Sequence, residues 1–178
     1  GERPWNRNAF YNTQNVNKKS LSLNLKTERG REILRGLVAI SDIVLENFSA
    51  GAMGRLGFEY DDLRAIKDDI VMVSMPGFGK TGPEASYVAH GPTIEAVAGN
   101  LALQGYENEG PLPSGLLAWG DPVAGITGGF AAVVAWTYHE LTGRGTHVDL
   151  SHIESAIPMN FEAFLDFANE RLRKIAGE

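Results

Sequence analysis

The chain has 178 residues, 43% of them hydrophobic and 21% charged, so it is long and apolar enough for one globular domain with its own core. A formal net charge of −6 argues against a nucleic-acid-binding face, and the lack of cysteine excludes disulfides, zinc–thiolate sites and cysteine nucleophiles. No apolar run approaches the roughly 20 residues of a membrane helix, and we predict a cytoplasmic protein with neither a membrane nor a nucleic-acid partner.

The first half of the sequence alternates strand and helix patterns after an irregular, polar lead-in over residues 1–17. Ser20 to Leu25 alternates polar and apolar side chains, which is typical of a half-buried strand, whereas Thr27 to about Ile40 has helical apolar spacing. The predicted elements, in order, are strand 20–25, helix 27–40, strand 43–45, helix 61–67 and strand 70–75. Two such successive crossover units indicate an α/β fold with a parallel sheet.

Glycine and proline dominate the next stretch, which separates this region from a more helical second half. The predicted elements there are a loop over 76–92, a helix from Pro92 to about Leu103, a long, largely buried helix over 122–141, a strand at 147–150 and a last helix toward Lys174. Ser151 and Glu154 have the S-x-x-E spacing of a capping box, which predicts where that last helix begins.

A glycine-rich segment, Gly77-Phe78-Gly79-Lys80-Thr81-Gly82, matches the G-x-G-x-x-G pattern directly after a predicted strand. In a dinucleotide-binding protein this loop opens a helix, but here Pro83 follows at once without a helical apolar stripe. A Walker loop would need glycine at Ser74, so the surrounding sequence disfavours both nucleotide interpretations. Glycines at the carboxyl end of a strand still let the backbone approach a ligand, which makes Gly77 and Gly79 candidate contacts.

Two further polar segments stand at positions that suit a ligand. Glu46-Asn47-Phe48 ends the second predicted strand, at the edge where open α/β sheets bind ligands, although a plain turn explains it equally well. Gly120-Asp121-Pro122 precedes the long helix, and Asp at the N-cap with Pro after it is ordinary capping chemistry. A carboxylate there is also stabilised as an anion by the helix dipole and is available as a nucleophile. Both interpretations of Asp121 stay open at this point.

The histidines show no spacing that identifies a site. His90 lies in a predicted loop, where a histidine is usually just solvated, and His147 and His152 flank the last strand without an acid or nucleophile at a telling distance in sequence. The chain has no H-E-x-x-H or similar spacing, so no metal site is predicted, and no G-x-S-x-G elbow of a serine hydrolase.

Taken together, five segments are similar, in order and spacing, to motifs of the family III CoA-transferases (the CaiB/BaiF type), which include formyl-CoA and carnitine CoA-transferases. The segments are residues 15–25, 46–57, 77–83, 120–121 and 142–150. The resemblance runs from about residue 12 to residue 157 and implies a Rossmann-like parallel sheet with flanking helices. It makes residues 1–178 a single partial domain, without the start of the family's large domain and without its C-terminal small domain.

The resemblance also implies the chemistry. Coenzyme A is transferred between an acyl-CoA thioester and a carboxylic acid, without a metal, and Asp121 is the nucleophile that passes through an aspartyl-CoA thioester. The partners implied are the acyl-CoA, the acid and a second copy of the chain in a homodimer. The implied CoA contacts are Asn47, Phe48, Arg55 and Lys18, and the glycine-rich loop adds Gly77 and Gly79 as candidate contacts.

The sequence departs from the family pattern at two places. Asn24 stands where the family usually has aspartate, and the loop around His90 lacks a common G-[YH]-D motif. Related α-methylacyl-CoA racemases use a histidine–aspartate pair as acid and base, and His90 and Asp121 fall at the matching positions. Because His90 is followed by Gly-Pro-Thr-Ile rather than by the racemase run, we prefer a transferase. The third hypothesis is a truncated, inactive CoA-binding or interaction domain.

Overall fold

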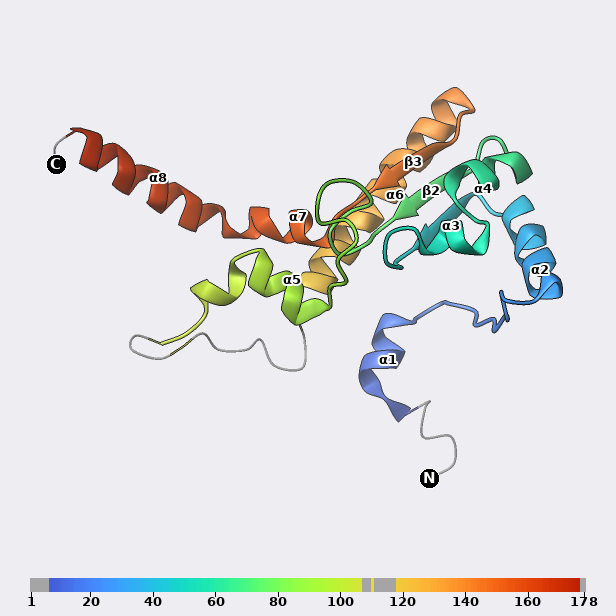
Figure 1. Ribbon diagram of the computed structural model, residues 1–178, viewed down its shortest axis with the longest axis horizontal. Coiled ribbons are helices and arrows are strands. Elements are labelled where there is room, and N and C mark those ends of the chain that lie inside the picture. Colours follow the sequence, from blue (N-terminus) through green and yellow to red (C-terminus); the bar gives the residue numbers. More distant parts are fainter. Residues whose placement is uncertain (1–6, 107–109, 111–117, 177–178) are drawn as a thin grey trace. The chain divides into compact units, whose positions relative to one another are not determined.

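The computed structural model describes residues 7–106, 110 and 118–176. It divides into two compact units, Gly1–Leu34 and Arg35–Glu178 (Figure 1). The first unit contains α1 (Ala9–Gln14), which begins after Asn8, whose side-chain oxygen accepts a hydrogen bond from the Tyr11 amide at 3.1 Å. The predicted lead-in is therefore partly helical, and its first six residues lie outside the described part of the chain.

The strand predicted at 20–25 is wrong, because these residues form no ladder with any described strand. The polar–apolar alternation is present, with Leu23 and Leu25 half-buried between exposed neighbours, but alternation alone does not supply the hydrogen-bonded partner that defines a strand. Asn24 instead turns the chain: its carbonyl accepts from the Thr27 amide and hydroxyl, at 3.1 and 2.8 Å. Helix α2 (Glu28–Ala39) then confirms the predicted helix.

The second unit contains a three-stranded parallel sheet in the order β1-β2-β3. The strands are β1 (Ile43–Glu46), β2 (Val71–Ser74) and β3 (Thr146–Asp149), and each lies within two residues of its predicted position. Residues Ile43, Val71 and Thr146 stand in register across the sheet. Because β2 is central, all four of its residues are buried, as expected for a parallel strand covered on both faces.

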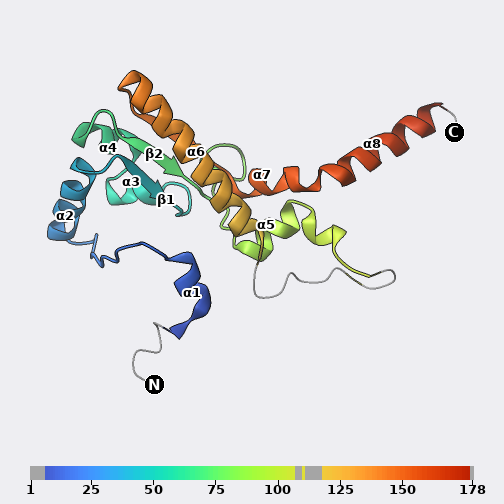
Figure 2. The same ribbon diagram turned by 180° about the vertical axis from the view of Figure 1, so that it is seen from behind.

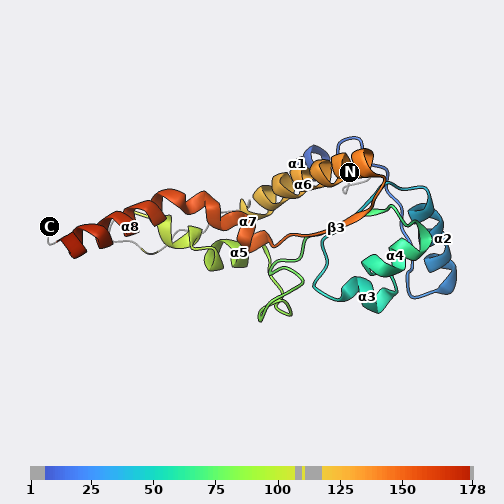
Figure 3. The same ribbon diagram turned by 90° about the horizontal axis from the view of Figure 1, so that it is seen from above.

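Helices cover both faces of the sheet (Figures 2 and 3). Helix α6 (Gly120–Thr142) lies on one face, where Ala124 and Ala135 pack against Val71 and Val73. Strand alternation turns Met72 to the opposite face, on which α3 (Ala52–Leu56) and α4 (Tyr60–Ile66) lie.

The prediction that α6 is largely buried is wrong, because only the side that packs on the sheet is covered. The outer side presents apolar side chains to solvent: Ile126 is 76% exposed, Phe130 70% and Leu141 81%. In the described part of the chain, no helix combines the length and apolarity that crossing a lipid bilayer requires.

Two predicted helices are interrupted for local reasons. The helix predicted over 92–103 ends early as α5 (Gly91–Val97), because the chain turns at Gly99 in the left-handed region (φ 88°) before the 3₁₀ turn η2 (Asn100–Leu103). The last predicted helix is divided by Pro158, which has no amide for a helical hydrogen bond. Its parts are α7 (His152–Ala156), the 3₁₀ turn η3 (Ile157–Asn160) and α8 (Phe161–Ala176).

Candidate functional site

A cavity of about 600 Å³ opens where all three strands end, within the second unit. Its walls come from the segments after β1 and β2, the loop before α5, and the first residues of α5, α6 and α7. The lining residues are Asn47, Phe48, Ser49, Gly77, Tyr87, Val88, Ala89, His90, Gly91, Ile94, Asp121 and His152. The volume lies within the range typical of small-molecule sites, and the position is the carboxyl edge at which parallel sheets bind ligands.

The cavity brings together five of the residues predicted from sequence: Asn47, Phe48, Gly77, His90 and Asp121. Two others, Arg55 and Gly79, lie in the same unit but do not line it. Lys18 belongs to the first unit, where its ammonium donates to the Gln14 carbonyl at 2.8 Å.

Asp121 lies two residues further into the helix than predicted. Helix α6 begins at Gly120 with Trp119 as its N-cap residue, so Asp121 belongs to the first helical turn and is not itself the cap. The expected stabilisation of an anion at this helix end still applies there, because the first-turn amides have no acceptor within the helix. The Asp121 side chain is 56% exposed, so a ligand in the cavity can reach the carboxylate.

Gly91 allows α5 to come close to Asp121. A Cβ at this position would overlap the Cβ of Ala118 and would lie 2.9 Å from Oδ2 of Asp121. Any side chain at position 91 would therefore displace the carboxylate or the chain that leads into α6. The glycine before Pro92, which the sequence places simply in a loop, is a packing requirement of the site.

A buried carboxylate ties α5 to the start of α6. Glu95 is fully buried, and its Oε1 accepts a hydrogen bond from the Trp119 amide at 2.6 Å. Gly120 packs against Ile94 so closely that a Cβ there would meet the Ile94 methyl at 2.8 Å. These contacts of Trp119 and Gly120 fix the start of α6, and with it the Asp121 backbone, against α5.

His152 is the functional candidate that sequence reasoning missed. It is the first residue of α7, its side chain is buried, and its Nδ1 lies 3.6 Å from Oδ1 of Asp121. Burial lowers the pKa of His152, and the neighbouring Asp121 only partly offsets that shift. The available signal was its place directly after the last strand, since residues at that edge meet those that follow the other strands.

The glycine-rich loop is held internally. Asp149 at the end of β3 accepts the Lys80 amide at 2.9 and 3.1 Å, and the Lys80 ammonium donates to Glu59 at 2.6 Å. Gly79 adopts a left-handed conformation (φ 80°) against Asp149 and Ser151. The Lys80 amide and ammonium, which a bound phosphate would need, are thus already bonded to Asp149 and Glu59. In addition, residues 83–90 after the loop are not helical. Both findings argue against a dinucleotide or Walker site.

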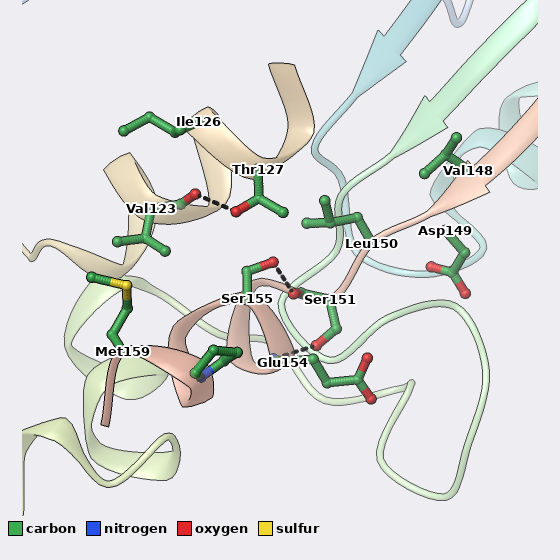
Figure 4. A pocket seen from close by; sticks show the side chains of 11 residues that line it. Val123, Ile126, Thr127, Val148, Asp149, Leu150, Ser151, Glu154, Ser155 and Met159 are labelled. Atoms are coloured by element: carbon green, nitrogen blue, oxygen red, sulfur yellow. Dashed lines mark hydrogen bonds between the residues drawn. The ribbon is translucent and has the colours of Figure 1, made fainter. Parts of the chain in front are cut away.

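A second cavity, of about 640 Å³, lies between α6, β3 and the α7–η3 segment (Figure 4). Its walls are mostly apolar, with Val123, Ile126 and Met159 among them. The Ser151 hydroxyl accepts from the Glu154 amide at 3.2 Å, which confirms the predicted cap of α7 (Figure 4). No residue predicted from sequence as catalytic or CoA-binding lines this second cavity.

Comparison with known proteins gives concordant results. The family model for CoA-transferase family III matches residues 2–177. A formyl-CoA:oxalate CoA-transferase of Streptomyces avermitilis is 39% identical over 142 residues, which are 80% of this chain and 34% of the relative. An acetyl-CoA:oxalate CoA-transferase of Acetobacter aceti is 34% identical over 160 residues, 89% of this chain and 40% of the relative.

The fold is shared with a CaiB/BaiF family protein from Brucella suis, whose crystal structure matches with a TM-score of 0.81 at 30% identity. That match covers 85% of this chain and 40% of the other. The chain thus spans 34–40% of the length of these relatives. With nearly all of its sequence inside the family model and its sheet and flanking helices matching a member's structure, the chain belongs to CoA-transferase family III.

Proposed function

We propose that this chain carries the nucleophile and part of the coenzyme A site of an enzyme that moves CoA from an acyl-CoA thioester to a carboxylic acid. The observation that carries the proposal is the Asp121 carboxylate, which stands at the start of a 23-residue helix and opens into the cavity lined by Asn47, Phe48 and His90. Relatives of this chain are named for such exchanges, between formyl-CoA or acetyl-CoA and oxalate.

In the proposed reaction, a carboxylate oxygen of Asp121 attacks the thioester carbonyl. The C–S bond breaks, CoA leaves as a thiolate, and a mixed anhydride remains on Asp121. The thiolate then attacks the aspartyl carbonyl and releases the first acid as a carboxylate, which leaves an aspartyl-CoA thioester. The acceptor acid repeats these steps in reverse, forming a second anhydride, and the thiolate takes the new acyl group and frees Asp121. One thioester replaces another, so nucleophilic catalysis divides a difficult exchange into easier steps without an external energy source.

The surroundings of Asp121 suit this chemistry. Each tetrahedral intermediate carries an oxyanion, and the Gly120 and Asp121 amides, which precede the first helical hydrogen bond of α6 at Val123, are donors that favour negative charge. The exposed Phe48 ring offers an apolar surface, and Asn47 beside it offers amide donors and acceptors, both of which suit the thioester end of CoA. Arg55, exposed on α3, suits a phosphate of CoA through its planar guanidinium. Roles for Lys18 and Gly79, a homodimer and a cytoplasmic location belong to the same proposal through the family resemblance.

The racemase alternative keeps one supporting observation, since His90 and Asp121 line the same cavity. The histidine within ion-pair distance of Asp121, however, is His152. A racemase would exchange the α-proton of a branched acyl-CoA for deuterium in heavy water, whereas the transferase proposed here exchanges none. A scaffold that only binds CoA would do neither.

Mass spectrometry of the chain incubated with an acyl-CoA tests the proposal. We expect a CoA thioester on the peptide that contains Asp121, and its loss in Asp121→Asn, which keeps the size of the side chain but removes the attacking anion. The Streptomyces avermitilis relative, treated in parallel, is the positive control for detecting the CoA adduct. An adduct on the relative but none on this chain, or equal labelling of the Asn variant, contradicts the proposal.

A further inference from the structure

The buried imidazole of His152 has two different surroundings for its two nitrogens. Nδ1 faces the Asp121 carboxylate, 3.6 Å from Oδ1. Nε2 is buried and makes no hydrogen bond of ordinary geometry with the described residues, although the Met75 backbone is close enough to the ring to raise its pKa. The residue is only 4% exposed, so water does not readily satisfy that second nitrogen.

The charge state of His152 follows from the groups around it. Burial lowers its pKa, while Asp121 from α6 and the Met75 backbone after β2 act in the opposite direction. His90 and Tyr87, both from the segment before α5, are the other titratable side chains that line the cavity. Burial is the largest of these influences, so the ring is neutral at neutral pH.

A neutral imidazole carries one proton, and the geometry decides which nitrogen holds it. With the proton on Nε2, a buried donor would lack a well-placed acceptor, and the lone pair of Nδ1 would face a carboxylate. With the proton on Nδ1, the donor lies next to Oδ1 of Asp121 and the repulsion between lone pair and carboxylate is removed, while Nε2 is a buried acceptor without a donor instead of a buried donor without an acceptor. The separation of 3.6 Å exceeds a hydrogen bond by about 0.5 Å, a gap of the kind that closes in catalytic pairs once substrate is bound.

We infer that His152 is a positioning residue for Asp121: its Nδ1–H holds the carboxylate in the orientation for attack and leaves the negative charge of the nucleophile intact. A lysine or an imidazolium at this place would orient the carboxylate equally well but would pair with its charge and weaken it as a nucleophile. The inference rests on the proposed function, because it assigns His152 a role in the attack by Asp121. Its first test nevertheless needs no turnover.

That test reads the tautomer of His152 directly. The chain has four histidines, and a long-range proton–nitrogen correlation spectrum of the isotope-labelled chain distinguishes protonated Nδ1 from protonated Nε2, with the His152 signals assigned by their loss in His152→Asn. We expect the Nδ1–H form near neutral pH. In Asp121→Asn the pKa of His152 should fall further, because the carboxylate that raises it is gone. The Nε2–H form, or a pKa that ignores the Asn substitution, overturns the inference.

The second test uses the position of the donor. Asparagine places an N–H close to where Nδ1 stands in histidine, glutamine places it close to Nε2, and leucine has none. In the adduct assay, His152→Asn should keep its rate within a few-fold, while His152→Gln and His152→Leu should lose on the order of 10–100-fold, the effect expected when a reacting group is misplaced by an ångström. Thermal unfolding of the three variants controls for stability.

The outcomes separate the two proposals. Equal rates for the Gln and Asn variants, or rates that simply follow melting temperature, mean that His152 is structural. If the wild-type chain forms no adduct while the relative does, the proposed function fails, and the tautomer and its response to Asp121→Asn still decide whether the pair exists.

Discussion

Because Gly91 has no side chain, α5 can come close to the Asp121 carboxylate, and adding a single methyl group at position 91 tests this contact. In Gly91→Ala the new methyl group overlaps the Ala118 Cβ and approaches Oδ2 of Asp121 to 2.9 Å. We expect a loss of about 1–3 kcal/mol in the free energy of unfolding, as for other overpacked sites, together with loss of the CoA adduct. Urea denaturation and the adduct assay measure the two effects.

Gly36 supplies the matched control for this substitution, because a Cβ there meets nothing within 4 Å. Gly36→Ala in α2 should leave adduct formation unchanged and should not lower stability. If the Gly91→Ala variant were as stable and as reactive as the wild type, the chain that leads into α6 would move aside freely, and Gly91 would not be a packing requirement of the site.

Individual residues of the site were partly predictable from the sequence. Asn47, Gly77 and Asp121 each follow or precede a recognisable element at one edge of the sheet, and parallel strands bring such positions together whatever their separation in the chain. His152 satisfied the same rule but carried no motif. Its significance depends on burial and on a distance of 3.6 Å from Asp121, neither of which sequence spacing encodes.

Helix α6 contains Gly125, Gly128 and Gly129 close together, and the structure predicts different consequences for replacing them. A Cβ at Gly125 or Gly129 meets nothing within 4 Å, whereas one at Gly128 would lie 2.5 Å from the sulfur of buried Met75. Alanine at 125 or 129 should raise the free energy of unfolding by about 0.5–1 kcal/mol each, because it reduces the freedom of the unfolded chain.

Gly128→Ala has the same helix propensity gain but must displace Met75, so we expect it to be at least about 1 kcal/mol less stable than Gly129→Ala. Chemical denaturation of the three variants measures the difference. If all three were stabilised alike, Met75 would repack at no cost, and the close contact of α6 with the sheet would not depend on glycine.

At the scale of elements, the local sequence predicted those with an apolar pattern of their own. The helix at 28–39 has apolar residues at helical spacing, the strands at 43–46 and 71–74 are short continuous apolar runs, and α6 is a long stretch rich in Ala, Val and Gly. The strand predicted at 20–25 failed because a strand also needs a neighbour, which local pattern does not supply. The break in the last helix at Pro158 and the left-handed turn at Gly99 were both readable in the sequence, since proline lacks the amide and glycine is the usual residue just after a helix end.

Across the whole molecule, one buried and one half-buried histidine, together with an ion pair, make stability depend on pH in one direction. Burial lowers the pKa of His147, with Lys80 adding to the effect, and burial also lowers that of His152. The unfolded chain, with histidine pKa values near 6.5, therefore takes up protons first as the pH falls. The contribution of these two histidines to the free energy of unfolding is fully present above about pH 6.5, and it is lost as the pH falls toward their pKa values in the folded chain. Hydrogen bonding from Lys80 lowers the pKa of Glu59, which adds a further loss below its ordinary value of 4.5.

We therefore expect the midpoint of urea unfolding to fall between about pH 7.5 and pH 5.5 and to fall again below about pH 4.5. The double variant His147→Gln, His152→Asn removes both titrating rings and should flatten the first part of the curve. Glutamine keeps an amide in reach of the Ser74 hydroxyl, which lies 2.9 Å from Nε2 of His147. Stability that stays level or rises on acidification to about pH 5.5 would contradict this assignment of the titrating groups.

The exposed side of α6 has a consequence for the behaviour of the chain at interfaces. Ile126, Phe130 and Leu141 lie along a helix whose other side is fixed to the sheet, so this apolar strip cannot rotate inward as it does in a free amphipathic peptide. The folded chain therefore presents a fixed apolar surface. It should adsorb to phenyl resins and to air–water surfaces without unfolding. Lowering the ionic strength should release it from the resin, because the hydrophobic attraction weakens at low salt.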